Sequence, residues 1–329
     1  MDTKDRLLIL LQYLKDNTDE ETPTSNTELR QMFREIGESV SMPTLRDDIA
    51  ALRKYGYDID VNEVNGVGTY YKFLGRDWSL PELQILTDAV SASQFLSSEK
   101  TGMLTEKLRQ MAGPSERKKL RPSIMTAQHV KAPNEQLLYT VQTIQEAIDS
   151  DRCITFRHDA YDTQLRRVPK HNGFSYEVSP YATIWKNDRY YLVGWSEKHD
   201  GIANFRIDRM ELPKLSRKKR HPIPDELHLE DHSDKIFSMF DGPEETVTLR
   251  CRPDLMNMIV DQFGTSLEIP RRDENSLDVI VTVHLSPTFY GWLFQFAGEM
   301  TVIAPEHVCE QYALRLQTAI DDALGSLNI

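Results

Sequence analysis

This sequence of 329 residues has no long hydrophobic run and no recognisable catalytic signature. No apolar stretch approaches the roughly 20 residues needed to cross a bilayer, and the N-terminus lacks the pattern of a signal peptide. The motifs G-x-S-x-G and H-E-x-x-H are absent, and Gly66-Val67-Gly68 lacks both a following Gly-Lys-Ser/Thr and the strand–helix setting of a dinucleotide loop. We therefore expect a soluble, cytoplasmic protein that is not an enzyme and has no cofactor. A nucleotide hydrolase is the distant alternative.

Cysteine is scarce as well. Cys153, Cys251 and Cys309 lie far apart, and none belongs to a C-x-x-C pair. An odd number of cysteines without that spacing predicts reduced thiols in the cytosol rather than a disulfide framework. His228 and His232 have a spacing that a metal site can use, but they lie in an acidic segment typical of a linker. We predict no metal site.

Basic residues are fewer than acidic ones, 39 against 51, which gives a net charge of −12. Its distribution is uneven. Residues 151–221 hold 15 lysines and arginines against 9 aspartates and glutamates, whereas residues 222–329 hold 6 against 19 and residues 1–80 hold 10 against 15. Phosphate neutralisation supplies most non-specific affinity for nucleic acid, so the acidic N-terminal region predicts weak binding of that kind. The basic middle region predicts an anionic ligand.

Two helices are predicted before residue 40. The first carries apolar residues at helical spacing, at Leu7, Leu8, Leu11 and Leu14. Ser25 and Glu28 form a capping box for the second, and Gly37 suits its end. Its expected inward residues are Leu29, Met32, Phe33 and Ile36.

A third helix is predicted from Ser41, the expected N-cap, to Gly56, the expected stop, with Pro43 in its first turn. One face is apolar, formed by Leu45, Ile49 and Leu52. Asn65-Gly66 then marks a β-hairpin between β-branched and aromatic residues. A helix presented at its N-terminus and followed by a two-stranded wing is how a winged helix-turn-helix reads DNA.

The expected DNA contacts follow from this reading. Ser41, Thr44, Arg46 and Arg53 lie off the apolar stripe of the third helix, and the wing offers the segment from Asn65 to Lys72. The helix should enter the major groove, while the wing should touch the backbone or minor groove beside it. A three-helix bundle with an incidental hairpin is the alternative.

Residues 1–76 resemble the DNA-binding domain of the DeoR-like bacterial regulators, whose recognition helix follows a Ser-x-x-Thr-(aliphatic)-x-Arg-Asp-(aliphatic) pattern. The matching residues here are Ser41, Thr44, Leu45, Asp48 and Ile49. Asp47 stands where a basic residue is frequent in that family, and Arg46, one position earlier, is expected to take over a phosphate contact.

The sequence predicts a helical linker over residues 77–134. Ser79 and Glu82 form a capping box, and the following helices either carry a dimer contact or pack only against their own chain. A helix over Leu137–Ile148 and several short strands from Cys153 onward predict a small barrel or sandwich. After an acidic linker at 221–243, the order of elements approximates the β-α-β-β-α-β split sandwich.

The middle region carries a second resemblance. The residues that carry it, in order and spacing, are Ser179-Pro180-Tyr181, Trp185, Arg189-Tyr190-Tyr191-Leu192-Val193-Gly194 and Phe205-Arg206-Ile207-Asp208-Arg209. They resemble the WYL domain, which is named after a Trp-Tyr-Leu triplet, here Tyr190-Tyr191-Leu192. With the winged head before it and the β/α tail after it, the whole chain resembles the WYL-domain transcriptional regulators with a C-terminal WYL extension (WCX) domain.

The resemblance implies an Sm/SH3-like β-barrel that senses a ligand through a basic, aromatic surface, in some members a single-stranded nucleic acid. Arginines beside aromatic rings can pair with phosphates and stack on bases. The expected ligand contacts are Arg206 first, then Tyr181 and Tyr191, then Arg209, Arg189 and Lys170. Alternatives remain open, because strand alternation places either Tyr190 or Tyr191 in the core, Arg209 can pair with Asp208 or Glu211, and 217–220 can be a solvated loop.

These observations combine into one prediction. The fold is multidomain α+β, with a winged helix-turn-helix at 1–76, a helical linker at 77–134, a WYL barrel at 135–222 and a ferredoxin-like α/β domain at 240–329. The predicted function is a homodimeric transcriptional regulator that binds double-stranded operator DNA and senses single-stranded nucleic acid or a nucleotide, without membrane contact. The alternative is a single-stranded nucleic-acid-binding module whose duplex-binding head is not functional.

Overall fold

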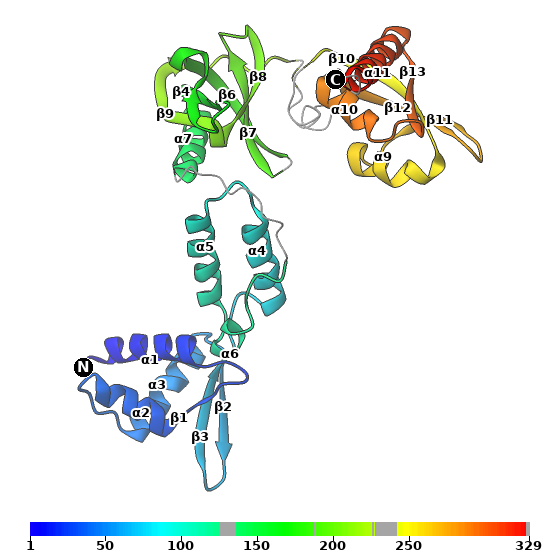
Figure 1. The fold of residues 1–329 in the computed structure, drawn as a ribbon. Coiled ribbons are helices and arrows are strands. Elements are labelled where there is room, and N and C mark those ends of the chain that lie inside the picture. The colour runs from blue at the N-terminus through cyan, green and yellow to red at the C-terminus, as the bar shows by residue number, and fades with distance from the viewer. Residues whose placement is uncertain (125–135, 187, 226, 228–241, 327–329) are drawn as a thin grey trace. The chain divides into compact units, whose positions relative to one another are not determined.

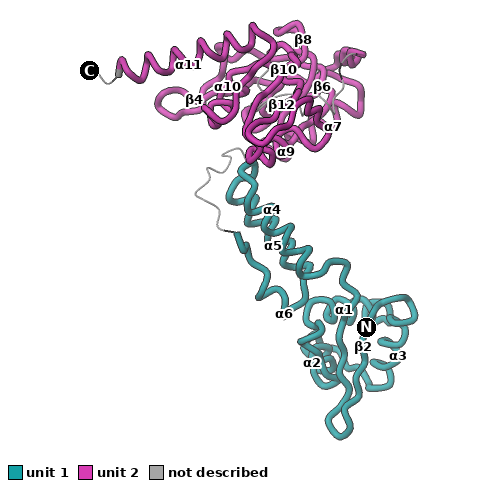
Figure 2. Tube along the Cα trace, turned by 90° about the vertical axis from the view of Figure 1, so that its right-hand side faces the viewer, with its two compact units in different colours: residues 1–135 teal, residues 136–329 magenta. Residues whose placement is uncertain are grey.

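The computed structural model describes residues 1–124, 136–186, 188–225, 227 and 242–326. The chain divides into two compact units, residues 1–135 and 136–329 (Figure 2). The fold is a mixed α+β arrangement with three antiparallel sheets, which confirms the predicted fold class at that level. No helix within those ranges is both long enough and apolar enough to cross a membrane.

Three helices and a small sheet make up the N-terminal region (Figure 1). They are α1 (Thr3–Asn17), β1 (Thr24–Ser25), α2 (Asn26–Glu35), α3 (Met42–Lys54), β2 (Ile59–Val64) and β3 (Gly68–Phe73), and the sheet order is β1-β3-β2. The Ser25–Glu28 capping box forms as predicted. Gly37 and Gly56 follow their helices at φ of +83° and +92°, a backbone that favours glycine. The winged helix-turn-helix assignment remains a prediction, which this order of elements supports.

The core of this region corrects two expected positions. Leu10, Leu14, Leu29 and Leu45 are fully buried among the three helices and the sheet. Leu8, however, is 66% exposed, because residues 7–11 are apolar at every position and the sequence leaves the helical phase ambiguous. Ile36 is 51% exposed, because α2 ends at Glu35 and Ile36 follows it as the C-cap.

The helical linker contains α4 (Leu80–Ala92), α5 (Ser98–Met111) and the short α6 (Pro114–Arg117). The Asp19 carboxylate, which is 5% exposed, ties α6 to the N-terminal region. It accepts hydrogen bonds of 2.7 Å from both the backbone N–H and the hydroxyl of Ser115, and one of 2.8 Å from the backbone N–H of Thr22. The Arg76 guanidinium donates hydrogen bonds to the backbone carbonyls of Lys15, Thr18 and Phe73 in the same region.

We predict that Asp19→Asn destabilises unit 1 by about 2 kcal/mol, because the amide offers N–H groups to partners that are themselves donors. Burial raises the pKa of Asp19, but the hydrogen bonds from Ser115 and Thr22 lower it more, so the net shift is downward. A lowered pKa contributes stability above the unfolded value of about 3.9 and loses it as pH falls through the folded value. Chemical denaturation of the full chain between about pH 3 and 6 should therefore show a steeper acid loss for wild type than for Asp19→Asn. Equal slopes would contradict this role of the carboxylate.

Unit 2 begins with α7 (Leu137–Asp149) and a six-stranded sheet. The strands are β4 (Arg152–Tyr161), β5 (Arg167–Pro169), β6 (Ser175–Lys186), β7 (Arg189–Ser196), β8 (Gly201–Arg206) and β9 (Met210–Lys219), with 3₁₀ turns at η1 (Lys170–Gly173) and η2 (Ile207–Arg209). The order is β5-β4-β6-β7-β8, with β9 paired to β4. Among the described strands no pairing joins β8 back to β9 or β5, so a closed Sm/SH3-like barrel is not confirmed.

Two strands include segments whose composition is typical of turns or loops. The Ser179-Pro180-Tyr181 segment lies inside one continuous strand, β6, and a register shift between Pro180 and Ala182 accommodates the proline. The basic run at 217–220 is mostly strand, because β9 extends to Lys219. Gly194 faces Pro180 across the ladder, and a Cβ there would lie 2.3 Å from the Ser179 carbonyl oxygen, so only glycine fits.

The C-terminal domain contains β10 (Glu244–Cys251), η3 (Pro253–Leu255), α9 (Met256–Phe263), β11 (Glu268–Arg272), β12 (Leu277–His284), α10 (Pro287–Phe294), β13 (Met300–Ala304) and α11 (Glu306–Ser326). Its sheet order is β11-β12-β10-β13. The ferredoxin-like assignment remains a prediction that this order supports. Most of the predicted linker at 221–243, including His228 and His232, lies outside the described residues.

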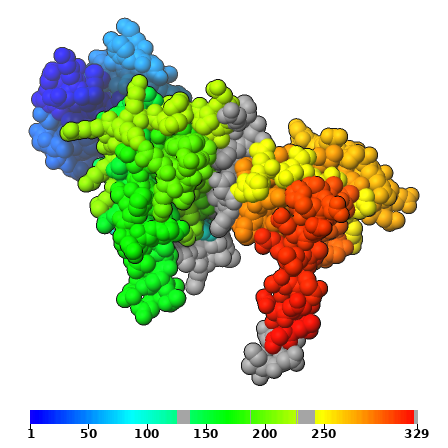
Figure 3. All heavy atoms as spheres, turned by 90° about the horizontal axis from the view of Figure 1, so that it is seen from above, coloured from blue at the N-terminus to red at the C-terminus, as the bar shows by residue number. Residues whose placement is uncertain are grey.

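Helix α11 packs on its own domain through its first half, where Val308 and Tyr312 are buried and Leu316 is partly buried. Its C-terminal half extends beyond the rest of the domain in the space-filling view, where it is drawn in red (Figure 3). Leu314, Ile320 and Leu324 are exposed along it.

Candidate functional sites

Helix α3 presents its N-terminal turn to solvent. The Ser41 hydroxyl accepts a hydrogen bond from the Thr44 backbone N–H at 3.3 Å and lies 2.7 Å from the Thr44 hydroxyl, which confirms the predicted cap. Leu45, Ile49 and Leu52 are buried, so the predicted inner face is confirmed too. Packing of that face leaves Ser41 exposed and Thr44 half-exposed at the tip of the helix.

Arg46 and Arg53 are exposed on the outer face of α3, and Asn65 is exposed at the tip of the hairpin. Lys72 is half-buried in β3. Arg46 pairs with Glu63 of β2, whose carboxylate lies 3.9 Å from the guanidinium with both side chains largely exposed. Such an exposed pair is weak, so Arg46 can exchange Glu63 for a phosphate at small cost.

A partly buried ion pair holds α3 against α1, and no sequence signal predicted it. The Arg6 guanidinium donates to the Asp48 carboxylate at 2.5 and 3.0 Å, and their side chains are 16% and 6% exposed. Asp48 is the acidic residue of the DeoR-like motif. Its side chain is buried and positions α3, whereas Arg46, two residues earlier, is exposed.

In the middle domain, Arg206 at the end of β8 makes a two-bond ion pair with Asp208, at 3.1 and 2.7 Å. Burial raises the pKa of Asp208, but the hydrogen bonds and charge of Arg206 lower it more, so the carboxylate stays ionised. Arg206 lies opposite Tyr191 in the β7–β8 ladder, so both side chains occupy the same face of the sheet. Arg206 is 26% exposed and is therefore still reachable from solvent.

Tyr191 and Arg206 share this face, and Arg189 lies two residues before Tyr191 in the same strand, β7. The charges of Arg206, Arg189 and Arg209 all act on Asp208, and Lys170 and Arg209 act together on His158. Arg209 forms no ion pair within the described ranges, because Asp208 pairs with Arg206 and Glu211 pairs with Arg167 at 3.2 Å. Burial and the charge of Arg206 lower the pKa of Arg209.

The two tyrosines among the expected ligand contacts, Tyr191 and Tyr181, are more buried than Arg206. Tyr191 is 8% exposed and packs with Val193, Ile184 and Ile202, whereas Tyr190 is half-buried against Trp185, so Tyr191 is the core member of the pair. Tyr181 is 4% exposed, and its hydroxyl donates to the Pro222 carbonyl at 2.9 Å. The arginine whose charge acts on Tyr181 is Arg220. Tyr181 is therefore not brought to the Arg206 group, by which we mean Arg206, Asp208, Arg189 and Arg209.

A partly buried histidine, His158, lies beside a row of aromatic rings. His158 makes edge contacts with Tyr176 and Phe205 at 6.4 and 6.1 Å. Its Nε2 atom is buried and has no hydrogen-bond partner among the residues described. Burial, followed by the charges of Lys170 and Arg209, lowers the pKa of His158 to about 4, so the ring is neutral near pH 7. No sequence motif pointed to this histidine.

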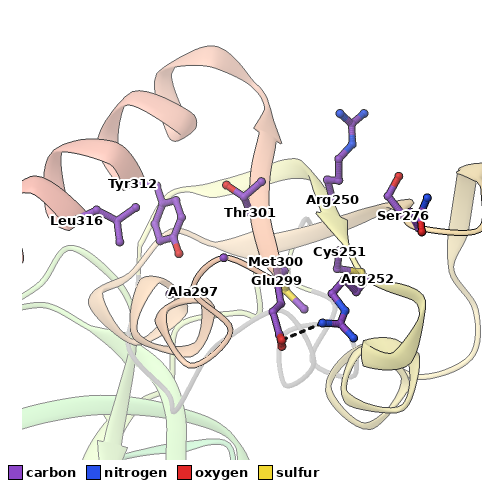
Figure 4. Close-up of a pocket in the computed structure, with 12 residues that line it drawn as sticks. Arg250, Cys251, Arg252, Ser276, Ala297, Glu299, Met300, Thr301, Tyr312 and Leu316 are labelled. Atoms are coloured by element: carbon purple, nitrogen blue, oxygen red, sulfur yellow. Dashed lines mark hydrogen bonds and ion pairs between the residues drawn. The ribbon is translucent and has the colours of Figure 1, made fainter.

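A cavity of about 420 Å³ opens in the C-terminal domain beside β10, β13 and α11 (Figure 4). Arg250 in its wall donates to Asp278 at 2.7 and 2.8 Å, and Arg252 pairs with Asp254 at 2.7 Å and with Glu299 at 3.2 Å. Both arginines are thus already neutralised by carboxylates. The Arg206 group, with three arginines around one carboxylate, is better suited to an anion.

Comparison with known proteins identifies two domains. Residues 139–215 match the family model of the WYL domain, and residues 243–320 match that of the WCX domain. No curated protein matches the chain.

Among solved structures, the chain is similar to proteasome accessory factor B/C (PafBC) of Arthrobacter aurescens, with 17% identity over 96% of this chain and a TM-score of 0.28. It spans 46% of that PafBC chain. It is also similar to a CRISPR Cas-related protein, with 11% identity over 99% of this chain and 82% of the other, and a TM-score of 0.36.

Proposed function

This chain is a WYL-domain protein with an additional WCX domain, and we propose on that premise that it is a DNA-binding transcriptional regulator. Its helix α3 and hairpin would bind double-stranded operator DNA, and its WYL domain would sense single-stranded nucleic acid or a nucleotide. The observation that carries the proposal is the presentation of α3, whose apolar face is buried while Ser41, Arg46 and Arg53 face solvent.

The duplex contacts divide by chemistry. Thr44 and Ser41 at the N-terminal turn of α3 would reach base edges or phosphates in the major groove, where a recognition helix presents its first residues. Arg46 and Arg53 would neutralise phosphates, and Asn65 and Lys72 would contact the backbone from the wing. The head holds more acidic than basic residues, so we expect weak non-specific binding and a corresponding reliance on specific contacts.

The ligand contacts centre on Arg206. A phosphate would bind its remaining N–H groups, with Arg209, Arg189 and Lys170 adding positive charge and Tyr191 forming the floor. Tyr181 would join them only if its hydroxyl left the Pro222 carbonyl. Ligand binding would alter the geometry of the two heads of a homodimer, and with it the affinity for the operator.

A cytoplasmic homodimer with contacts through residues 77–134 fits this proposal. Two-fold symmetry requires operator half-sites one helical turn apart, about 34–36 Å, or a multiple of it. The second candidate function is a single-stranded nucleic-acid-binding module with a non-functional head. The acidic surplus in residues 1–80 and the Glu63 carboxylate beside Arg46 favour that alternative.

We predict that Arg46→Ala weakens duplex binding by about tenfold, because it removes one charge-assisted contact to phosphate. The slope of log affinity against log salt concentration should fall by about 1. The measurement is fluorescence anisotropy with the duplex upstream of the protein's own gene, over a range of salt concentrations.

The matched control is Arg166→Ala, which removes an exposed arginine from the middle domain and should leave both affinity and slope unchanged. An unchanged slope for Arg46→Ala would remove Arg46 from the phosphate contacts. Wild-type protein that binds single strands but no duplex would favour the alternative function.

A further inference from the structure

Two loops of the WYL domain bring four basic side chains together on one exposed surface. Lys170 and His171 belong to η1, and Lys198 and His199 belong to the turn between β7 and β8. All four are exposed. We call them the histidine–lysine face. None belongs to the WYL motif residues, and the sequence prediction included only Lys170.

The buried ring of Tyr176 forms the base of this face. His199 stacks on it at 6.3 Å between ring centroids with an interplanar angle of 19°, and His171 meets its edge at 6.5 Å. The Lys198 ammonium donates to the Tyr176 hydroxyl at 3.2 Å. It also lies 4.7 Å from the ring centroids of both Tyr176 and Phe174. These contacts hold His171, Lys198 and His199 on an aromatic platform, and Lys170 precedes His171 in η1.

Phe174 adds an apolar surface at the same place. It is 44% exposed and packs edge-on against Tyr176 at 5.1 Å. An exposed ring beside cations is the arrangement by which proteins bind single-stranded nucleic acid, with the ring stacking on a base and the cations pairing with phosphates.

The electrostatic surroundings of the two histidines are cationic. Partial burial and the charges of Lys198 and Lys170 lower the pKa of both His171 and His199, and His199 adds to the effect on His171. The acidic groups in the same turn are Glu197, which pairs with Lys218, and Asp200. On β4, His158 is neutral near pH 7 and adds no charge. Both histidines are thus mainly neutral near pH 7 when no anion is present.

We propose that the histidine–lysine face binds a phosphate group of a single-stranded nucleic acid or nucleotide and takes up protons as it does so. The proposal rests on the proposed function, because it extends the ligand surface from Arg206 through Lys170 to the β7–β8 turn. A phosphate between the lysines would offset their repulsion of an imidazolium, and so favour the charged form of each histidine.

The sign of the pH dependence follows from linkage. Because the anion favours protonated histidines, affinity is greatest at a pH where they are charged and is lost as pH rises through their pKa in the bound state. A rise of one pKa unit on binding corresponds to about a tenfold gain in affinity per histidine. Arginine contacts such as Arg206 stay charged throughout and supply the part of the affinity that does not depend on pH.

The test compares wild type with the double variant His171→Asn, His199→Gln by fluorescence anisotropy on labelled oligothymidylate at about pH 6 and pH 8. Asparagine suits residue 171 because its φ is +52°, a left-handed conformation that asparagine tolerates. We expect wild type to bind at least about tenfold tighter at the lower pH, and the double variant to lose that gain while keeping its affinity at the higher pH. The control His307→Gln, on α11, should behave as wild type.

A second readout does not depend on affinity. The NMR titration of the His171 and His199 Cε1–H resonances should move to higher pH when oligothymidylate or thymidine monophosphate is added. A shift with the oligonucleotide alone assigns the face to a nucleic-acid strand, and a shift with both assigns it to the phosphate of a nucleotide.

Two results overturn the inference: wild-type affinity that is equal at both pH values, or a double variant that keeps the full pH dependence. Binding that is independent of pH but abolished by Arg206→Ala would leave the proposed function intact and dismiss this face. Failure of both probes to bind at any pH would dismiss the nucleic-acid ligand of the proposed function as well.

Discussion

Asp48→Ala should destabilise unit 1 by about 3 kcal/mol. Removing the carboxylate leaves the Arg6 guanidinium without its two hydrogen bonds in a site where it is only 16% exposed. An uncompensated charge in such a site costs far more than an exposed ion pair contributes. Because Asp48 joins α3 to α1, the loss should also disorder the proposed recognition helix.

Urea denaturation and hydrogen exchange of the full chain measure this effect. Protection should fall first in residues 3–17 and 42–54, which the pair holds together. The matched control is Asp47→Ala, one residue away and exposed, which should change stability by less than about 0.5 kcal/mol. If the two variants were equally stable, the buried pair would not have the proposed role. A double variant, Arg6→Met with Asp48→Leu, should recover much of the loss, because no charge is left unpaired.

The same pair marks the limit of what the sequence predicts. Caps and turns were predictable because their partners lie within a few residues: Ser25 with Glu28, Ser41 with Thr44, and Gly66 in its hairpin. Arg6 and Asp48 are separated by 42 residues, and Asp19 and Ser115 by 96. Neither spacing has a periodic signal, so only the folded chain reveals these partners.

Two strand segments could not be predicted for a related reason. β1 is only two residues long, Thr24–Ser25, and is defined by its pairing with β3 rather than by its own composition. The basic end of β9 has the composition of a loop, yet its ladder with β4 keeps it extended.

The candidate ligand site could likewise be predicted only in part. The motif series around Arg206 and Tyr191 pointed to one face, and the β7–β8 register does place these two side chains opposite each other. His158, His171 and His199 escaped notice, because single histidines in separate segments carry no spacing signal. They meet only because β4, η1 and the β7–β8 turn converge on Tyr176.

Arg206→Ala should weaken oligothymidylate binding by about thirtyfold, corresponding to about 2 kcal/mol for a lost charge-assisted, partly buried contact. It should also abolish the effect of oligothymidylate on duplex affinity. Duplex affinity without ligand should stay within about twofold of wild type, because Arg206 lies in unit 2 and the proposed duplex contacts lie in unit 1. Anisotropy with both probes at one fixed salt concentration tests all three expectations.

Asp208→Asn is the matched control, because it changes the partner rather than the arginine. It removes the carboxylate that competes with a phosphate for Arg206 and should therefore strengthen oligothymidylate binding several-fold. Arg206→Lys keeps the charge but loses the two-bond geometry, so its affinity should lie between those of wild type and Arg206→Ala. Opposite effects of Arg206→Ala and Asp208→Asn cannot come from general loss of structure, because both substitutions break the same ion pair. If both weakened binding equally, the pair would be structural. If Arg206→Ala abolished duplex binding as well, the WYL domain itself would hold nucleic acid, and the single-stranded-binding alternative would replace the regulator.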